Sequence, residues 1–321
     1  MVELGIKQLE KNKLFDFAKQ LSRIASNNNM EIGSCAEILD LEQCGIRHNS
    51  CIDKNLIESI IGCKINASKD KNQRKECGCI ESIEIGTYNT CKNGCKYCYA
   101  KSLLDFRKMW NPNDPAVADI NKIRRKISKL PKGTPAIRLG GMTDCFQPIE
   151  KKYGVTYETI KALNENNLPY LIVTKSALVA DDKYVDILDK DLAHIQITVT
   201  TTDDDFSRTY ENASVPSERI FAIEKLQELG FDVQLRLSPY IKEFVDFNIL
   251  NNVKCDKILV EFLRVNSWIK KWFDVDYSRY TIKHGGYQHL PLDEKIKDIK
   301  LITGFKEITV CEDETMAYEY W

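Results

Sequence analysis

From residue 82 onward, short apolar runs rich in β-branched residues alternate with segments whose apolar positions recur at helical spacing. Apolar strands separated by helices predict a parallel sheet that is covered by helices. About six such units fit an open barrel better than a closed eightfold one. We therefore predict an α/β fold, a partial (β/α)6 barrel of the TIM type over residues 81–321. The predicted strands are SIEIG, PAIRLGG, YLIVTKS, HIQITVT, FDVQLRLS and KILVEFLRV, with a late EITVC.

One helix between these runs is clear from its sequence, SERIFAIEKLQELG. Its apolar residues Ile220, Ile223 and Leu226 cluster at helical spacing, after Pro216 and before Gly230. Proline favours the first turn of a helix and glycine its end. In this architecture, chemical groups gather at the carboxyl ends of the strands.

The first 80 residues follow a different pattern. Apolar side chains recur at helical spacing between residues 4 and 25, and Asp53 is a candidate N-cap for a shorter helix that includes LIESIIG. We therefore predict a small, mainly helical and cysteine-rich region over residues 1–80.

Composition and charge narrow the class of protein. The 321 residues are 43% hydrophobic, which suffices for a sizeable core, and the net charge is -1. This balance gives no global attraction to nucleic acid or to a membrane, although KIRRK at residues 122–126 could form a local basic patch. The N-terminal stretch lacks the apolar run of a signal peptide, and no segment approaches a membrane span, so we expect a cytoplasmic protein.

The chain has 12 cysteines, and a reducing compartment favours metal ligation over a disulfide framework. Three of them form CxxxCxxC directly after the first predicted strand. Thiolates are ligands of iron–sulfur clusters and zinc, but structural zinc sites favour four protein ligands. Three cysteines on a four-iron cluster leave one iron open. Gly94 permits a tight loop, and the neighbouring Tyr97 can shield a cluster or pack on a ligand. The three predicted cluster ligands are Cys91, Cys95 and Cys98.

The stretch CKNGCKYCYA resembles the cluster loop of the radical SAM superfamily, in the form found in the spore photoproduct lyase-like group. The resemblance continues through LGGMTDCFQPIEKKYG, VTKSALV and ITVTTTDDDFSRTYENASVPSERI, and it covers about residues 80–240. Separately, CAEILDLEQCGIRHNSCIDKNLIESIIG and the following KECGCIESIEIG resemble an uncharacterised cysteine-bearing family.

The resemblance implies an enzyme that reductively cleaves S-adenosylmethionine at a [4Fe-4S] cluster to a 5'-deoxyadenosyl radical, which abstracts hydrogen from a substrate. It implies an electron donor such as flavodoxin or ferredoxin, and a nucleobase or nucleic acid is the leading substrate class. A lyase-type reaction fits the named group, and a transferase-type reaction stays open. Carried over by position, the residues that bind the cofactor are Tyr97, Gly140, Gly141, Thr143, Lys175, Thr198, Arg236 and Ser238.

One departure from the spore photoproduct lyase pattern concerns a cysteine that returns hydrogen. The matching position here is Gly141, whereas Cys145 follows Asp144 and is a weak candidate for a catalytic residue. Glu211 and Arg219 match an acidic and a basic family position, for which we predict a structural salt bridge. Two alternatives stay open: a radical SAM enzyme that modifies a peptide or small metabolite, and a non-catalytic metal-binding module.

A second metal site is predicted ahead of the barrel. Cys77 and Cys79 are two residues apart, and Cys35 and Cys51 lie upstream. Four thiolates from a loop-rich region could hold an auxiliary [4Fe-4S] cluster or a structural zinc. A CxC pair is strained when both thiolates bind one metal ion, but it suits neighbouring irons of a cubane. The CxC spacing therefore favours the cluster.

Overall fold

The computed structural model describes residues 10–311 except 36 and 72. The chain divides into two compact units, which are described separately. The small unit comprises the described residues up to Ser82 together with Gly133–Pro135, and the large unit comprises Ile83–Lys132 and the described residues from Ala136 onward. Within the described part of the chain, no helix has the length and apolar character to span a membrane.

The large unit is built on a seven-stranded sheet in the order β11-β8-β7-β6-β5-β4-β3. Every neighbouring pair is parallel, so the carboxyl ends of the strands meet at one edge. The seven apolar runs of the sequence all form strands of this sheet, which confirms the predicted α/β fold of the partial TIM type. The strands are β3 (Glu84–Ile85), β4 (Ile137–Leu139), β5 (Tyr170–Thr174), β6 (Ala193–Val199), β7 (Asp232–Tyr240), β8 (Lys257–Phe262) and β11 (Glu307–Val310).

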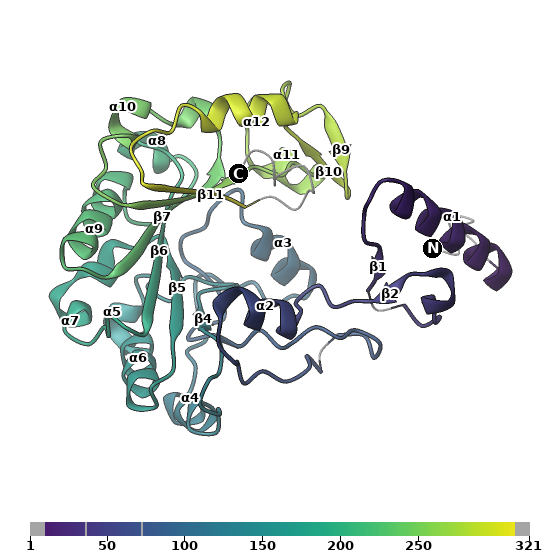
Figure 1. Ribbon diagram of the computed structural model, residues 1–321. Coiled ribbons are helices and arrows are strands. Elements are labelled where there is room, and N and C mark those ends of the chain that lie inside the picture. The colour runs from purple at the N-terminus through teal and green to yellow at the C-terminus, as the bar shows by residue number, and fades with distance from the viewer. Residues whose placement is uncertain (1–9, 36, 72, 312–321) are drawn as a thin grey trace. The chain divides into compact units, whose positions relative to one another are not determined.

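Helices cover one face of this sheet. Figure 1 shows α6, α7 and α9 along that face, with α3 on the opposite side. The predicted helix is α9; Pro216 stands in its first turn, and Gly230 beyond its end has a φ of 80°. The helices of the large unit are α3 (Tyr99–Phe106), α4 (Ile120–Ile127), α5 (Glu150–Tyr153), α6 (Val155–Glu165), α7 (Asp182–Val185), α8 (Asp204–Ser207), α9 (Pro216–Glu228), α10 (Phe247–Leu250), α11 (Ser267–Trp272) and α12 (Leu292–Ile299), with 3-10 turns η3 (Ala177–Ala180) and η4 (Lys242–Phe244).

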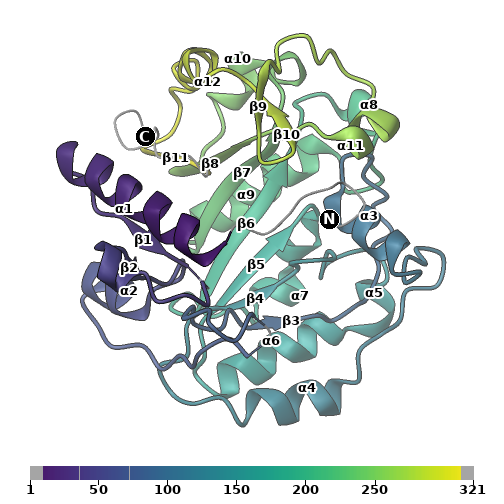
Figure 2. The same cartoon turned by 90° about the vertical axis from the view of Figure 1, so that its right-hand side faces the viewer.

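Alternation along the strands separates the core from the functional face. In β7, Val233, Leu235 and Leu237 are buried, while Arg236 and Ser238 between and beyond them are only half-buried. Successive strand residues point to opposite faces, so the apolar set packs under the helices and the polar set faces the other side. Figure 2 shows the succession of strands that presents this second face.

A hairpin of strands β9 (Ile282–His284) and β10 (Tyr287–His289) was not among the predicted strands. Its two-residue turn is Gly285-Gly286, both with positive φ, which is the conformation that a tight hairpin turn requires. The runs on either side are three residues long and mostly exposed, so they carry little apolar periodicity from which a strand could be predicted.

The small unit has short elements and a small core. Its elements are α1 (Lys11–Asn27), β1 (Gly33–Ser34), η2 (Glu42–Cys44), β2 (Arg47–His48) and α2 (Lys54–Ile61). The first predicted helix corresponds to α1; residues 4–9 of that prediction lie outside the described residues. Asp53 caps α2 as predicted, because its side chain accepts hydrogen bonds from the backbone N–H groups of Asn55 and Leu56.

Candidate active site

The CxxxCxxC loop, residues 91–98, opens onto a cavity of about 650 Å³ in the large unit. The loop follows β3 and leads into α3, so it lies at the carboxyl edge of the sheet. The cavity is lined by all three cysteines and by all eight residues that the sequence predicted for cofactor binding. These are Cys91, Cys95, Cys98, Tyr97, Gly140, Gly141, Thr143, Lys175, Thr198, Arg236 and Ser238.

Buried Asp144 fastens this loop to the sheet. Its carboxylate accepts hydrogen bonds from Asn93 Nδ2 at 3.0 Å, from Thr174 Oγ1 at 2.6 Å and from the backbone N–H of Lys175 at 2.8 Å. One side chain therefore connects the cysteine loop with the end of β5. Sequence reasoning missed this role, although an acidic residue in the run GGMTD directly after a strand was a usable signal.

Two further contacts hold the loop in place. Buried Gln147 donates from Nε2 to the carbonyl of Thr90 at 2.7 Å and accepts from the N–H of Lys92 at 3.1 Å. On the other side, the backbone N–H of Lys96 donates to the carbonyl of Tyr210 at 3.0 Å. Because these bonds involve the backbone on both sides of Cys91 and Cys95, they fix the path of the loop.

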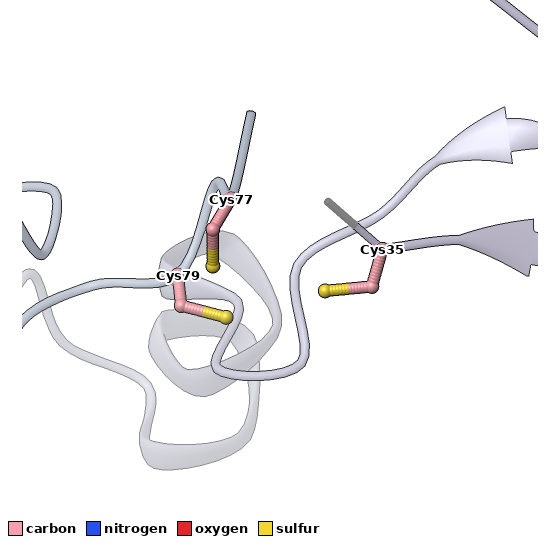
Figure 3. Close-up of side chains that lie close together, drawn as sticks. All are labelled: Cys35, Cys77 and Cys79. Carbon is pink, nitrogen blue, oxygen red and sulfur yellow. The ribbon is translucent and has the colours of Figure 1, made fainter. Parts of the chain in front are cut away.

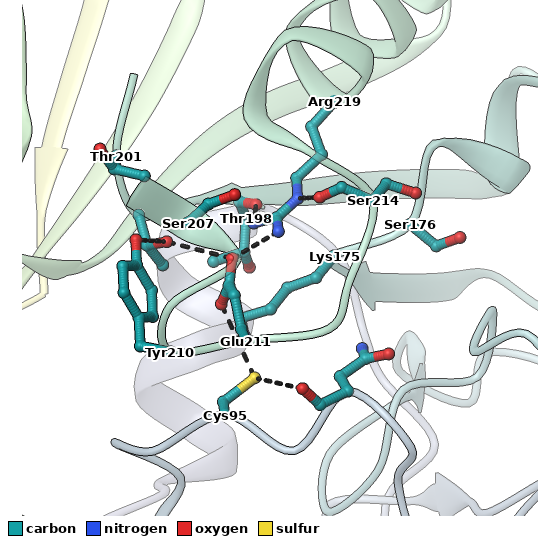
Figure 4. Close-up of polar contacts among 12 residues, drawn as sticks. Cys95, Lys175, Ser176, Thr198, Thr201, Ser207, Tyr210, Glu211, Ser214 and Arg219 are labelled. Carbon is teal, nitrogen blue, oxygen red and sulfur yellow. Dashed lines mark hydrogen bonds and ion pairs between the residues drawn. The ribbon is translucent and has the colours of Figure 1, made fainter. Parts of the chain in front are cut away.

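A buried ion pair lies next to Cys95, as Figure 4 shows. The Glu211 carboxylate pairs with the Arg219 guanidinium, and neither side chain is exposed to solvent, which confirms the predicted salt bridge. Glu211 also accepts hydrogen bonds from Tyr97 Oη and from Cys95 Sγ, the latter at 3.7 Å. Burial raises the pKa of Glu211, but Arg219 and Lys175 oppose it, and the net pKa lies below its usual value.

The net pKa shift has the opposite sign for the thiols, because burial dominates it. Burial raises the pKa of Cys91 to about 12, with the Asp144 carboxylate as the second cause, and it raises the pKa of Cys95 well above its usual value. Both thiols are therefore protonated at neutral pH until a metal displaces the proton. Burial alone would lower the pKa of Lys175, but the Glu211 carboxylate raises it, so this amine is charged at the cavity wall.

Gly140 and Gly141 allow the backbone to line the cavity. Gly140 has a φ of 88°, and a Cβ there would lie 2.4 Å from the carbonyl oxygen of Val173. A Cβ on Gly141 would lie 2.3 Å from the carboxylate of Glu84, which accepts a hydrogen bond from the N–H of Met142 at 3.2 Å. The positive φ and the backbone of β5 require glycine at Gly140, whereas the close neighbour of Gly141 is the movable end of the Glu84 side chain.

The sheet supplies a polar wall at its interior-facing positions. Arg236 on β7 pairs with Glu261 on β8, and Ser238 Oγ donates to the same carboxylate at 2.7 Å. Burial raises the pKa of Glu261, but Arg236 and Ser238 lower it below its usual value. Glu261 was not predicted from the sequence. Its signal was a charged residue inside the apolar strand KILVEFLRV.

The structure places Cys145 outside the cavity. Its side chain is 1% exposed, and it is not among the lining residues. Its backbone carbonyl accepts a hydrogen bond from Thr156 Oγ1 at 2.6 Å, and its thiol packs in the apolar core. The catalytic role predicted for Cys145 stays a prediction, and its position suits a small core residue.

The four cysteines predicted for a second site all lie in the small unit. The sulfur atoms of Cys35, Cys77 and Cys79 lie within 4.8 Å of one another (Figure 3). Cys51 Sγ lies 3.1 Å from Cys35 Sγ. All four are free thiols.

Comparison with known proteins agrees with this geometry. Residues 85–243 match the radical SAM superfamily, and residues 1–100 match a domain of unknown function, DUF1848. The large unit thus carries a radical SAM domain whose cysteine loop, parallel sheet and cavity have been described above. The protein is an enzyme of the radical SAM type, with a DUF1848 region at its N-terminal end.

The individual relatives share only low sequence identity with this chain. An uncharacterized protein of Methanocaldococcus jannaschii is 28% identical over 57% of this chain and 69% of its own length. An uncharacterized protein of Mycobacterium bovis is 22% identical over 50% of each chain, so this chain matches half of that relative. Among solved structures, a spore photoproduct lyase variant with bound AdoMet and dinucleoside spore photoproduct superimposes with a TM-score of 0.52 at 16% identity, over 70% of this chain and 75% of the other. A second spore photoproduct lyase mutant gives 0.53 at 15% identity over 77% and 80%. These structures share the fold.

The residues of the site fit the groups that this superfamily uses, S-adenosylmethionine and a [4Fe-4S] cluster. Three thiols on one short loop provide three of four cluster ligands, and the cavity beside them leaves room for a small molecule at the fourth place. Charged Lys175 suits a carboxylate, and the glycines after β4 admit close backbone approach.

Proposed function

We propose that this protein binds a [4Fe-4S] cluster on Cys91, Cys95 and Cys98 and S-adenosylmethionine in the adjoining cavity, and that it abstracts hydrogen from a substrate. The observation that carries the proposal is that the three thiols and all eight predicted cofactor residues line one cavity. When bound, the cluster supplies an electron that cleaves S-adenosylmethionine to methionine and a 5'-deoxyadenosyl radical. An electron donor such as flavodoxin or ferredoxin would deliver that electron.

The protein residues bind and orient the cofactor. The Lys175 amine lies at the carboxyl end of β5, 5.6 Å from the centre of the Tyr97 ring, and offers a charge-assisted hydrogen bond to the methionine carboxylate. The backbone at Gly140 and Gly141 and the Thr143 hydroxyl serve the amino group on the neighbouring strand end. Arg236 and Ser238, held by Glu261, serve the ribose.

Aromatic and basic side chains favour a nucleobase or nucleic-acid substrate. Two indole rings, Trp268 and Trp272, and the Tyr287 phenol line the cavity, and Trp268 is 49% exposed. Arg138 and Arg264 line it as well. Exposed aromatic rings stack on bases, and arginines bind phosphate, so this wall suits a flat, anionic substrate. A peptide or small metabolite is the alternative substrate class.

The first experiment is anaerobic reconstitution of the full chain with iron and sulfide, followed by a strong reductant and S-adenosylmethionine. We expect 5'-deoxyadenosine to accumulate, detected by liquid chromatography and mass spectrometry. Deuterated pools of DNA, RNA, peptides and metabolites then identify the substrate by label transfer into 5'-deoxyadenosine. Cleavage that persists undiminished without Cys91, Cys95 or Cys98 would refute the proposed site. Label from the peptide pool alone would refute the nucleic-acid assignment.

A further inference from the structure

The four cysteines of the small unit come from three separate segments. Cys35 follows β1, Cys51 precedes α2, and Cys77 and Cys79 form a CxC turn. The turn is fixed by backbone hydrogen bonds, since the N–H of Cys77 donates to the carbonyl of Arg74 at 2.9 Å. Figure 3 shows the sulfurs of the three labelled cysteines directed toward a common point.

The spacing of these sulfurs distinguishes a single ion from a cluster. Around one zinc ion with Zn–S bonds of about 2.3 Å, tetrahedral geometry places the sulfurs about 3.8 Å apart. In a cubane each thiolate binds a different iron, so the sulfurs lie farther apart. Cys35, Cys77 and Cys79 all lie within 4.8 Å of one another, whereas Cys51 Sγ is 3.1 Å from Cys35 Sγ but falls outside this mutual limit.

The cysteine loop of the large unit provides an internal comparison. Within residues 10–35, 37–71 and 73–311, the sulfurs of Cys91, Cys95 and Cys98 do not form a group with all distances under 4.8 Å. The wider set is the one that matches the radical SAM cluster loop. The compact set of Cys35, Cys77 and Cys79 therefore has the dimensions of a mononuclear site, and Cys51 beside Cys35 is the candidate fourth ligand.

The surroundings of the compact set are those of a metal-bound thiolate. The backbone N–H of Ile52 donates to Cys79 Sγ at 3.3 Å, an outer contact of the kind that orients metal ligands. A Cβ on Gly78 would lie 2.4 Å from Ser50 Oγ, so glycine at the centre of the CxC turn lets it approach the segment that carries Cys51. Cys77 and Cys79 are both buried.

Among its described residues, the small unit has only a small apolar core. Its separate hydrophobic cluster consists of four buried residues, and its strands are two residues long. Regions this small are commonly stabilised by a metal or by disulfides, and its thiols are free. The four residues of that cluster are Ala18, Leu41, Cys44 and Ile46.

We propose that Cys35, Cys51, Cys77 and Cys79 bind one zinc ion in a tetrahedral, all-thiolate site that takes the place of a hydrophobic core in the small unit. A d10 ion without redox chemistry fits a closed set of four thiolates, because no coordination place is left for a substrate. The proposal goes beyond the radical chemistry of the large unit. It differs from the auxiliary cluster that the CxC spacing alone favoured.

The test measures metal in the full chain before and after anaerobic reconstitution. We expect about one zinc per chain that survives exposure to air, and about four irons that do not. Zinc-edge X-ray absorption of the wild-type protein should show four sulfur neighbours at about 2.3 Å. This measurement needs no variant, so misfolding cannot obscure it.

Two variants and a control locate the site. Cys79→Ser and Cys51→Ser should lower the zinc content to a small fraction of the wild-type value, whereas Cys63→Ser should retain it. Cys51 is exposed, so its substitution opens no core cavity. About eight irons without zinc, no metal beyond about four irons, or full zinc retention in both ligand variants would each overturn the proposal. Zinc and iron are measured separately. The zinc content can therefore be interpreted even if the cluster of the large unit does not assemble.

Discussion

The two groups of cysteines in this protein are supported in opposite ways. The loop with Cys91, Cys95 and Cys98 is held by side chains from distant parts of the barrel, including Asp144, Gln147 and Glu211. The group in the small unit is held by backbone contacts of its own short turns.

The contacts that surround each group of cysteines therefore favour a different kind of metal site. A loop braced from outside can keep three ligands apart and leave one coordination place accessible from a cavity. A set that has little apolar structure around it needs the metal itself to hold the segments together. The first arrangement suits catalysis, and the second suits a structural ion.

The largest expected effect is the loss of iron from the cysteine loop of the large unit without loss of the proposed zinc from the small unit. Cys95→Ala removes one of three cluster ligands, so iron content and 5'-deoxyadenosine formation should both fall to background. Zinc in the small unit should be unchanged. Iron is measured spectrophotometrically and 5'-deoxyadenosine by mass spectrometry, with Cys63→Ala as the control. A Cys95→Ala protein that retains full cleavage would contradict the division of roles.

Removal of the proposed zinc should unfold one unit and spare the other. After treatment with a strong chelator under denaturant-free conditions, amides of α2 and of the turn around Cys79 should lose hydrogen-exchange protection, because structural zinc contributes about 10 kcal/mol to folding in small domains. Amides of β5, β6 and β7 should keep theirs, since the large core does not depend on the metal. Equal loss of protection in both units would contradict the claim that only the small unit depends on the metal.

Glu211→Gln tests the buried Glu211–Arg219 ion pair next to Cys95. The substitution leaves the buried Arg219 guanidinium without its charged partner, which typically costs about 3–5 kcal/mol. We expect the urea midpoint of the large unit to drop accordingly, while Glu218→Gln on the exposed surface of α9 changes little. A Glu211→Gln protein as stable as the wild type would mean that the ion pair contributes nothing net.

Asp144→Asn should weaken the cysteine loop by a smaller amount. The amide cannot accept all the hydrogen bonds that the carboxylate receives from Asn93, Thr174 and Lys175, and one unsatisfied buried donor costs about 1–3 kcal/mol. Iron loading should become incomplete at limiting iron, with Asp191→Asn as the exposed control. Normal loading at every iron concentration would argue that Gln147 alone suffices to hold the loop.

The smallest effect concerns the Arg236–Glu261 pair. Arg236→Gln removes the cation that lowers the pKa of Glu261, so this pKa should rise, as followed by carbon-labelled carboxyl NMR during titration. A carboxylate with a depressed folded-state pKa adds stability above its unfolded pKa and loses it as the pH falls through the folded pKa. The variant should therefore show a weaker loss of stability on acidification. An unchanged Glu261 pKa would mean that Arg236 is not the group that stabilises the ionised form of Glu261.

The fold could be predicted because its signals are local. Each strand of the sheet is a short apolar run such as YLIVTKS, and α9 begins at Pro216 and ends before Gly230. The cysteine loop was equally clear, since its three ligands lie within eight residues. The strand-end residues followed from a resemblance, and the structure places them around one cavity.

The sequence marks some further residues as unusual, but their partners could not be predicted because they depend on approach between distant segments. Asp144 acts through Asn93 and Thr174, which are 51 and 30 residues away along the chain. Glu261 meets Arg236 only when β7 and β8 pair. The spacing of sulfurs in the small unit likewise arises from three segments, whereas the CxC pattern taken alone favoured a cluster.

One feature of the small unit bears on how the chain is made. Gly133–Pro135 belongs to this unit, and the carbonyl of Gly133 accepts a hydrogen bond from the N–H of Asn66 at 2.7 Å. During synthesis this contact can form only after Gly133 has left the ribosome, by which time α3 and α4 of the large unit have already been translated. A chain cut after Ser82 would lack this contact.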